Sequence, residues 1–298
     1  MFFRLGLLLL VAAPIVEAQP FAFSGAERAA ILQLGPWPPK RGPDPANAVS
    51  GKPEAIALGE ALFFDPGLSG TGSVLCATCH VPYRRWQDGH ARAFGLEQAD
   101  LNTPSVLNVG FYRRFGWAGG NDALWKQSLR PLLEPREMRS SAAHVAAAVR
   151  ASHAAQYEKA FAHSPSADDE AVFSDVGRAL AAFQETLVTR RTAFDDFRDA
   201  LERGDVAALE RYPEAAQRGL HLFLGKGCVA CHSGPGFTSS ELAGGFRVPG
   251  LRNVALTAPY MHDGRAATLP DAARHSAASL DARELDDLVA FLESLSER

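Results

Sequence analysis

Hydrophobic residues recur every three or four positions in several segments, which is the spacing of one face of an α-helix. The two clearest stripes are Phe173, Val176, Leu180, Phe183 and Leu187, and then Leu285, Leu288, Val289, Leu292 and Leu295. Asp281 lies just before the second stripe, and Glu284 lies three residues after Asp281, which is the spacing of a helix capping box. No segment shows the polar and apolar alternation of a half-buried strand. We therefore predict a mainly α fold.

The N-terminus has the pattern of a secretory signal. A positive charge at Arg4 precedes an apolar stretch over residues 5–13, and a cleavage site with small side chains ends at Ala18. We expect residues 1–18 to be a signal peptide and the mature protein to be periplasmic. A membrane anchor is the alternative, but the stretch is shorter than the roughly 20 residues of a spanning helix. No later stretch is apolar enough to span a bilayer.

Proline and glycine concentrate between residues 35 and 53. Because proline removes a backbone donor and restricts φ, this composition disfavours a helix. We expect residues 19–52 to form an extended N-terminal arm.

A short pattern occurs twice. Pro53-Glu54-Ala55, Gly59 and Leu62-Phe63 reappear with the same offsets as Pro213-Glu214-Ala215, Gly219 and Leu222-Phe223. Such a repeat predicts two copies of one helical unit, although a chance match is the alternative. We predict a first domain over residues 53–205 and a second over residues 206–298.

Each repeat leads into a Cys-x-x-Cys-His motif. The motifs are Cys76, Cys79 and His80, and Cys228, Cys231 and His232. This motif attaches haem c through two thioethers, and its histidine binds the iron. A zinc site or a redox dithiol is the alternative, but neither needs a histidine after both pairs. We predict two cytochrome c-like helical domains, each with one covalently bound haem c.

Composition and charge narrow the possible functions. The 298 residues are 47% hydrophobic and 21% charged, so the chain can bury a core. A formal net charge of -4 and the lack of a basic run argue against nucleic-acid binding.

Longer motifs make the chain resemble the bacterial dihaem cytochrome c peroxidases and their MauG-type relatives. They are Leu62-Phe63-Phe64-Asp65, Asn102-Thr103-Pro104-Ser105, Trp117, Gln127, Glu137-Met138, Val248-Pro249-Gly250-Leu251-Arg252-Asn253 and Thr257-Ala258-Pro259-Tyr260-Met261-His262-Asp263-Gly264. The resemblance runs from about Pro53 to the C-terminus.

The resemblance implies roles for several residues. His80 would bind the peroxidatic iron, with Gln127 and Glu137 in the pocket opposite. Glu137 would move the protons of hydrogen peroxide, although as part of a charged turn it could simply be exposed. Trp117 would pass electrons between the haems, with an ordinary core role as the alternative.

The resemblance also implies a shared calcium ion. Its ligands would be Asn102 and the backbone oxygens of Thr257 and Pro259. Oxygen ligands suit this hard cation.

Two departures from the family pattern alter these expectations. Leu96 occupies the position of a histidine that caps the resting peroxidatic iron in classical members, and His90 in the same loop is a possible substitute. We expect an open, five-coordinate iron.

Ser276 occupies the position of the second haem's distal methionine or tyrosine, and serine is not a plausible ligand. His275 and Met261 are the nearby candidates, a solvated His275 and a five-coordinate iron being the alternatives.

The main hypothesis is a peroxidase that reduces hydrogen peroxide to water with electrons from a small cytochrome c or cupredoxin. The alternatives are a MauG-type oxidase of a partner protein and a dihaem electron carrier. Relatives suggest a possible homodimer.

Overall fold

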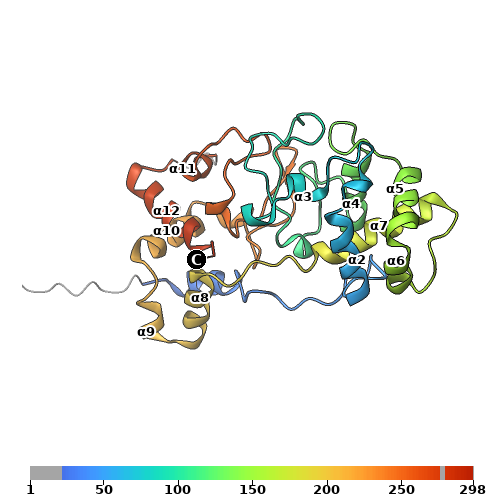
Figure 1. The fold of residues 1–298 in the computed structure, drawn as a ribbon. Coiled ribbons are helices and arrows are strands. Elements are labelled where there is room, and N and C mark those ends of the chain that lie inside the picture. Colours follow the sequence, from blue (N-terminus) through green and yellow to red (C-terminus); the bar gives the residue numbers. More distant parts are fainter. Residues whose placement is uncertain (1–21, 276–278, 298) are drawn as a thin grey trace, which may run out of the picture.

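The computed structural model describes residues 22–275 and 279–297, and its fold is mainly helical, as predicted (Figure 1). The helices are α1 (Gly25–Leu32), α2 (Pro53–Phe63), α3 (Cys76–Cys79), α4 (Leu124–Leu133), α5 (Ala142–Ala148), α6 (Ala154–Phe161), α7 (Asp169–Gln184), α8 (Ala193–Arg203), α9 (Val206–Leu209), α10 (Glu214–Gly225), α11 (Leu269–Ala273) and α12 (Ala282–Ser294). The short strands β1 (Leu242–Ala243) and β2 (Phe246–Arg247) pair antiparallel. The expected signal peptide and Ser276 lie outside the described residues.

The two strongest hydrophobic stripes form helices as expected. The first stripe lies on α7, which ends at Gln184, so Leu187 follows the helix. The second stripe lies on α12, where Asp281 is the N-cap and forms the predicted capping box with Glu284. Among the described residues, no helix is long and apolar enough to cross a membrane.

The helices form two groups, each with its own hydrophobic core. Helices α2, α4, α5, α6 and α7 enclose the first core, and α8, α10, α11 and α12 enclose the second. Figure 1 shows the two groups on opposite sides of the molecule, with α3 and long loops between them. We call these groups the first half and the second half.

Matching helix crossings explain the repeat that is visible in the sequence. A methyl group on Gly59 of α2 would lie 2.0 Å from the Ala179 carbonyl oxygen, and one on Gly219 of α10 would lie 1.9 Å from the Asp287 carbonyl oxygen. Phe183 and Phe291, four residues further along α7 and α12, lie against the same two glycines. Each half is therefore built on a glycine that lets two helix backbones touch.

The expectation of an extended arm over residues 19–52 is wrong for its first part, because α1 is a helix. Ser24 and Glu27 form a capping box at its start, and Ile31 is buried in the second core. After α1 the chain crosses beneath both halves to reach α2 (Figure 1). The capping box and the burial of Ile31 together stabilise α1. The prolines that follow it made the sequence favour an extended segment instead.

The predicted boundary at residue 205 also needs correction, because α8 belongs to the second core. Phe194, Phe197 and Leu201 of this helix are buried there. Asp195 and Arg252 form an ion pair at 2.8 Å, and both side chains are at most 2% exposed. The change from one core to the other therefore falls in the segment before α8.

Candidate functional site

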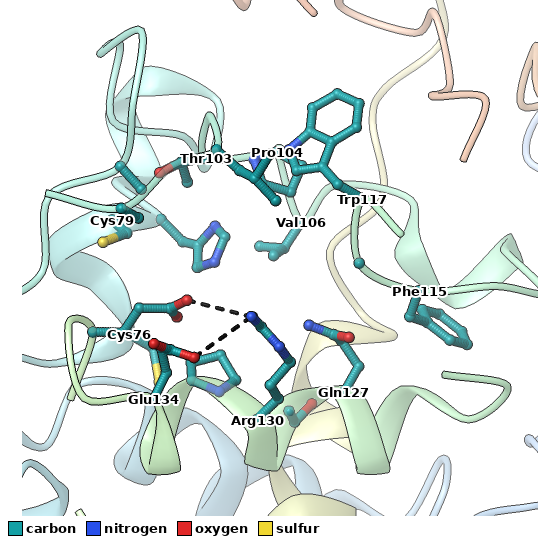
Figure 2. A pocket seen from close by; sticks show the side chains of 18 of the residues that line it. Cys76, Cys79, Thr103, Pro104, Val106, Phe115, Trp117, Gln127, Arg130 and Glu134 are labelled. Carbon is teal, nitrogen blue, oxygen red and sulfur yellow. Dashed lines mark hydrogen bonds and ion pairs between the residues drawn. The ribbon is translucent and has the colours of Figure 1, made fainter. Parts of the chain in front are cut away.

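A cavity of about 390 Å³ lies in the first half, which is within the range of cofactor pockets. Cys76, Cys79 and His80 line one side, while Gln127 and Glu137 line another. The structure thus brings together the first haem motif and the residues expected opposite it. Figure 2 shows Gln127 on α4 facing the space below Val106, with Cys76 and Cys79 across the cavity.

His80 is oriented by its own loop. Its Nδ1 lies 3.2 Å from the carbonyl oxygen of Trp86 and donates a hydrogen bond to it, so Nε2 is the nitrogen left for a metal. Behind the ring, Phe63 packs at 6.3 Å between centroids. This tautomer and support match an iron-binding imidazole.

The two thiols of the first motif are neither paired nor activated. Burial raises the pKa of Cys76 and of Cys79 to about 12, the reverse of a redox dithiol. Within the described ranges, no group of three or more His, Cys, Asp or Glu residues could hold a metal ion. The zinc and dithiol interpretations therefore gain no support.

Opposite His80, α4 and the turn after it present a charged cluster. Arg130 Nη1 lies 3.4 Å from Glu137 Oε1, and Arg130 Nη2 lies 3.7 Å from Glu134 Oε2. Figure 2 shows Arg130 reaching up between the acidic groups and Gln127. The sequence analysis missed Arg130, although its spacing of three residues from Gln127 puts both on one helix face.

Glu137 is a titratable group of the cavity wall whose environment alters its pKa. Burial raises the pKa of its carboxyl above the ordinary value, while the Arg130 cation acts in the opposite direction. Its backbone oxygen accepts a hydrogen bond from Leu96, which is how the 90–100 loop is attached to this wall. A partly buried carboxyl with a raised pKa suits proton transfer at neutral pH.

Gln127 is fixed by its neighbours. Its Oε1 accepts a hydrogen bond of 2.8 Å from Asn121 Nδ2, and a methyl group on Gly116 would lie 3.0 Å from the same oxygen. The amide nitrogen is thereby directed away from Asn121, toward the cavity that Gln127 lines. Figure 2 agrees with this orientation.

Trp117 lies on the cavity rim, between the two halves. Its Nε1 donates to the Asn102 carbonyl oxygen at 2.8 Å, and its ring centroid lies 6.5 Å from that of His262. The Trp117 carbonyl oxygen accepts from Arg247 of β2 at 2.7 Å. The residue is therefore in contact with the second half, as its expected role requires.

Arg247 is a second residue that the sequence did not reveal. Its guanidinium is buried and lines the cavity, and its hydrogen bonds go to the carbonyl oxygens of Gly116 and Val248. The described residues offer it no carboxylate, and burial lowers its pKa. A buried cation without an acidic partner fits the carboxylate groups of a haem.

The second motif repeats the geometry of the first around its histidine. His232 Nδ1 lies 3.1 Å from the Phe237 carbonyl oxygen, and burial lowers the pKa of the ring to about 4. The ring of His275 lies 6.3 Å from that of His232, centroid to centroid. His275 is thus near the second motif.

The expected calcium ligands come from segments that are in contact. The backbone nitrogen of Asn102 donates to the carbonyl oxygen of His262, three residues beyond Pro259, at 2.7 Å. Its side-chain nitrogen donates to the His90 carbonyl oxygen at 2.7 Å. A calcium site here stays a prediction.

The loop that carries Leu96 and His90 does not place either side chain in the cavity wall. Among the described residues, His80 is the one histidine that lines this cavity. The backbone nitrogen of His90 donates to the Asp88 carboxylate at 2.9 Å. The geometry gives no support to His90 as a substitute cap.

Comparison with known proteins agrees with this geometry. The model of the family described as di-haem cytochrome c peroxidase matches residues 53–203. The methylamine utilization protein MauG of Methylorubrum extorquens is 37% identical, over 82% of this chain and 78% of its own. The cytochrome c551 peroxidase of Nitrosomonas europaea is 32% identical, over 88% and 84%.

A solved structure has the same fold. It is a MauG-like protein associated with microbial copper homeostasis, with a TM-score of 0.72 and 26% identity over 88% of this chain and 96% of that one. The matching family is described as a di-haem family, and its relatives here include proteins named MauG and proteins named cytochrome c peroxidase. The chain belongs to the di-haem cytochrome c peroxidase family.

Proposed function

We propose that this protein is a c-type dihaem peroxidase that reduces hydrogen peroxide to water with electrons from a small cytochrome c or cupredoxin. The observation that carries the proposal is the cavity in which His80 faces a wall containing Gln127, Arg130 and Glu137. The family and its peroxidase relatives support the same reaction class.

The residues present fit two covalent haem groups. Cys76, Cys79 and His80 would hold the first, with Arg247 pairing with its carboxylates, and the second motif would hold the other. When bound, the haems supply the iron that coordinates peroxide and exchanges electrons.

Glu137 performs the proton transfers. Its Oε1 accepts the proton of one peroxide oxygen, and the carboxyl then returns this proton to the oxygen that leaves as water. Two further electrons and two protons complete the conversion of one peroxide into two waters. The raised pKa of Glu137 allows it both to accept and to release a proton.

Arg130 and Gln127 orient the reacting groups. The Arg130 guanidinium holds the Glu137 carboxyl from one side and offers positive charge to the departing oxygen. The Gln127 amide, held by Asn121, donates a hydrogen bond into the same space. Trp117 conducts electrons from the second half, where its contact with His262 lies.

A second candidate function is peroxide-dependent oxidation of a partner protein. It is favoured by the wall of the cavity, which among the described residues contains no histidine beyond His80, and by the 37% identity to a protein named MauG. The two functions differ in the electron source. Catalytic turnover with a reduced small redox protein supports the peroxidase, and a long-lived oxidised spectrum without donor turnover supports the alternative.

The substitution Glu137→Gln tests the peroxidase mechanism. Removing a general acid–base group lowers rates by about 10²–10⁴-fold, and we expect a loss of kcat in this range in peroxide-dependent oxidation of reduced cytochrome c. Glu134→Gln is the matched control, because it contacts the same arginine and we expect a much smaller effect. Equal turnover of wild type and Glu137→Gln would refute the role of Glu137.

We infer export to the periplasm by the signal at residues 1–18 and a possible homodimer. A calcium ion held by Asn102, Thr257 and Pro259 would brace the contact between the halves. The hydrogen bond to the His90 carbonyl oxygen uses the side-chain nitrogen of Asn102, and the side-chain oxygen would be the calcium ligand. Chelation should then lower the transfer rate between the haems.

A further inference from the structure

The second half contains a histidine pair that has no counterpart among the described residues of the first. His232 and His275 face each other with centroids 6.3 Å apart and with ring planes at 89°. His275 follows α11, which is anchored because Leu269 and Ala273 are buried in the second core. His275 therefore lies two residues beyond a helix whose own position is set by packing.

Both rings have the same nitrogen occupied. His232 Nδ1 bonds to the Phe237 carbonyl oxygen at 3.1 Å, and His275 Nδ1 bonds to the Ala272 carbonyl oxygen at 2.7 Å. A carbonyl oxygen only accepts, so each Nδ1 carries the hydrogen. In both rings Nε2 is left with a lone pair for a metal.

The separation agrees with one metal ion between the rings. An imidazole nitrogen binds a first-row metal at about 2.0 Å, and the ring centre lies about 1.1 Å behind it, so rings on opposite sides of one ion have centres about 6.2 Å apart. Two imidazoles in direct hydrogen bond through Nε2 would need one of them to donate, which the Nδ1 hydrogens exclude for neutral rings. Metal ligation explains both distance and tautomers.

We propose that His275 is the distal axial ligand of the second haem, whose iron is then held by two histidines. This inference rests on the proposed attachment of haem c at Cys228, Cys231 and His232. Two imidazoles saturate the axial positions, so this haem passes electrons without binding peroxide. Histidine in place of methionine also keeps the reduction potential lower.

His275→Ala in the full holoprotein tests the assignment. We expect the ferric protein to lose one low-spin haem per chain in its EPR and absorption spectra, while the mass still shows two covalent haems. Free imidazole should restore the low-spin signal. His275→Met should retain a low-spin site and raise its reduction potential.

Two matched variants make the result decisive. Met261→Leu removes the other candidate ligand, and Arg274→Ala changes the neighbouring exposed residue. We expect the low-spin content of both to equal that of the wild type. An unchanged low-spin signal in His275→Ala, or loss of that signal in Met261→Leu, would overturn the assignment.

The test separates this inference from the proposed reaction. Loss of the low-spin signal in His275→Ala supports the ligand even if the wild type shows no peroxide turnover, which would sink only the peroxidase. Full turnover in the wild type with an unchanged His275→Ala spectrum would sink only the ligand. If His275→Ala does not assemble, the potential of His275→Met decides: an unchanged potential contradicts the assignment.

Discussion

The two halves share a helix crossing and a histidine geometry, but they differ in what stands opposite the histidine. In both, a glycine lets one helix touch the backbone of another, and a histidine after a Cys-x-x-Cys turn donates through Nδ1 to a backbone carbonyl. In the first half, α4 and the turn after it place Gln127, Arg130 and Glu137 across from His80. In the second half, His275 faces His232.

This difference shows how one scaffold can serve two tasks. The repeated helix crossing positions the Cys-x-x-Cys-His motif in each half. The loops and helices that follow the motif supply the side chains opposite its histidine. A wall of acid, amide and guanidinium groups leaves space for a small substrate, whereas an imidazole closes that space. In the proposed function, the segments outside the repeat, and not the repeat itself, determine which half carries out chemistry and which passes electrons.

The largest expected effect on stability comes from the buried ion pair between Asp195 and Arg252 in the second half. Asp195→Asn leaves the guanidinium of Arg252 buried without its charge partner. Breaking such a pair costs about 3–5 kcal/mol, so we expect a clear fall in the thermal midpoint by circular dichroism. Replacing both residues with apolar ones should cost less than Asp195→Asn alone. Equal losses would contradict the desolvation argument.

A smaller and matched effect tests whether the two crossings are equivalent. Gly59→Ala and Gly219→Ala each place a methyl group about 2 Å from a carbonyl oxygen. Overpacking costs about 1–3 kcal/mol, and we expect similar losses of unfolding free energy in both variants.

The control for the crossings is Gly225→Ala at the end of α10, where a methyl group meets nothing within 4 Å. We expect a neutral or slightly stabilising change there, of at most about 1 kcal/mol. A loss confined to one of the two crossing glycines would break the comparison between the halves.

The smallest expected effect concerns the pH dependence of the first half. In the proposed mechanism, peroxide turnover needs Glu137 deprotonated, so we expect activity to fall as the pH drops through its pKa, which burial raises and Arg130 lowers. Arg130→Gln removes the positive charge that lowers the Glu137 pKa. We therefore expect the acid limb of the kcat profile to move to higher pH.

Other charges around Glu137 define the control for that measurement. Glu134 raises its pKa, and Arg136 lowers it less strongly than Arg130 does. We expect Arg136→Gln to shift the acid limb in the same direction but by less. A shift toward lower pH in Arg130→Gln would show that Glu137 is not the controlling base.

The sequence was informative wherever an interaction is local. Asp281 and Glu284 are three residues apart, so their capping box could be predicted, and it is present. The extended arm was predicted wrongly in part, because the helix α1 depends on burial of Ile31 against a core more than 150 residues away in the chain. Proline content says nothing about such a distant contact.

The same distinction holds for the site. Cys76, Cys79 and His80 form a contiguous motif, and Gln127 and Glu137 were found through the family's spacing, which the cavity brings together. Arg247 carries no sequence signal, because its partners are backbone carbonyls and the ring of Tyr112. Its role depends on burial, which no local pattern encodes.

By itself, the sequence determined the two Cys-x-x-Cys-His turns, the helical class and the repeated glycines, since short-range spacing and side-chain chemistry are sufficient for these. Only the tertiary structure decided which helix each glycine touches and that His275 faces His232 across 6.3 Å. Such pairings join segments that are distant in the chain. They depend on how the cores pack, because packing sets which side chains meet across a given space.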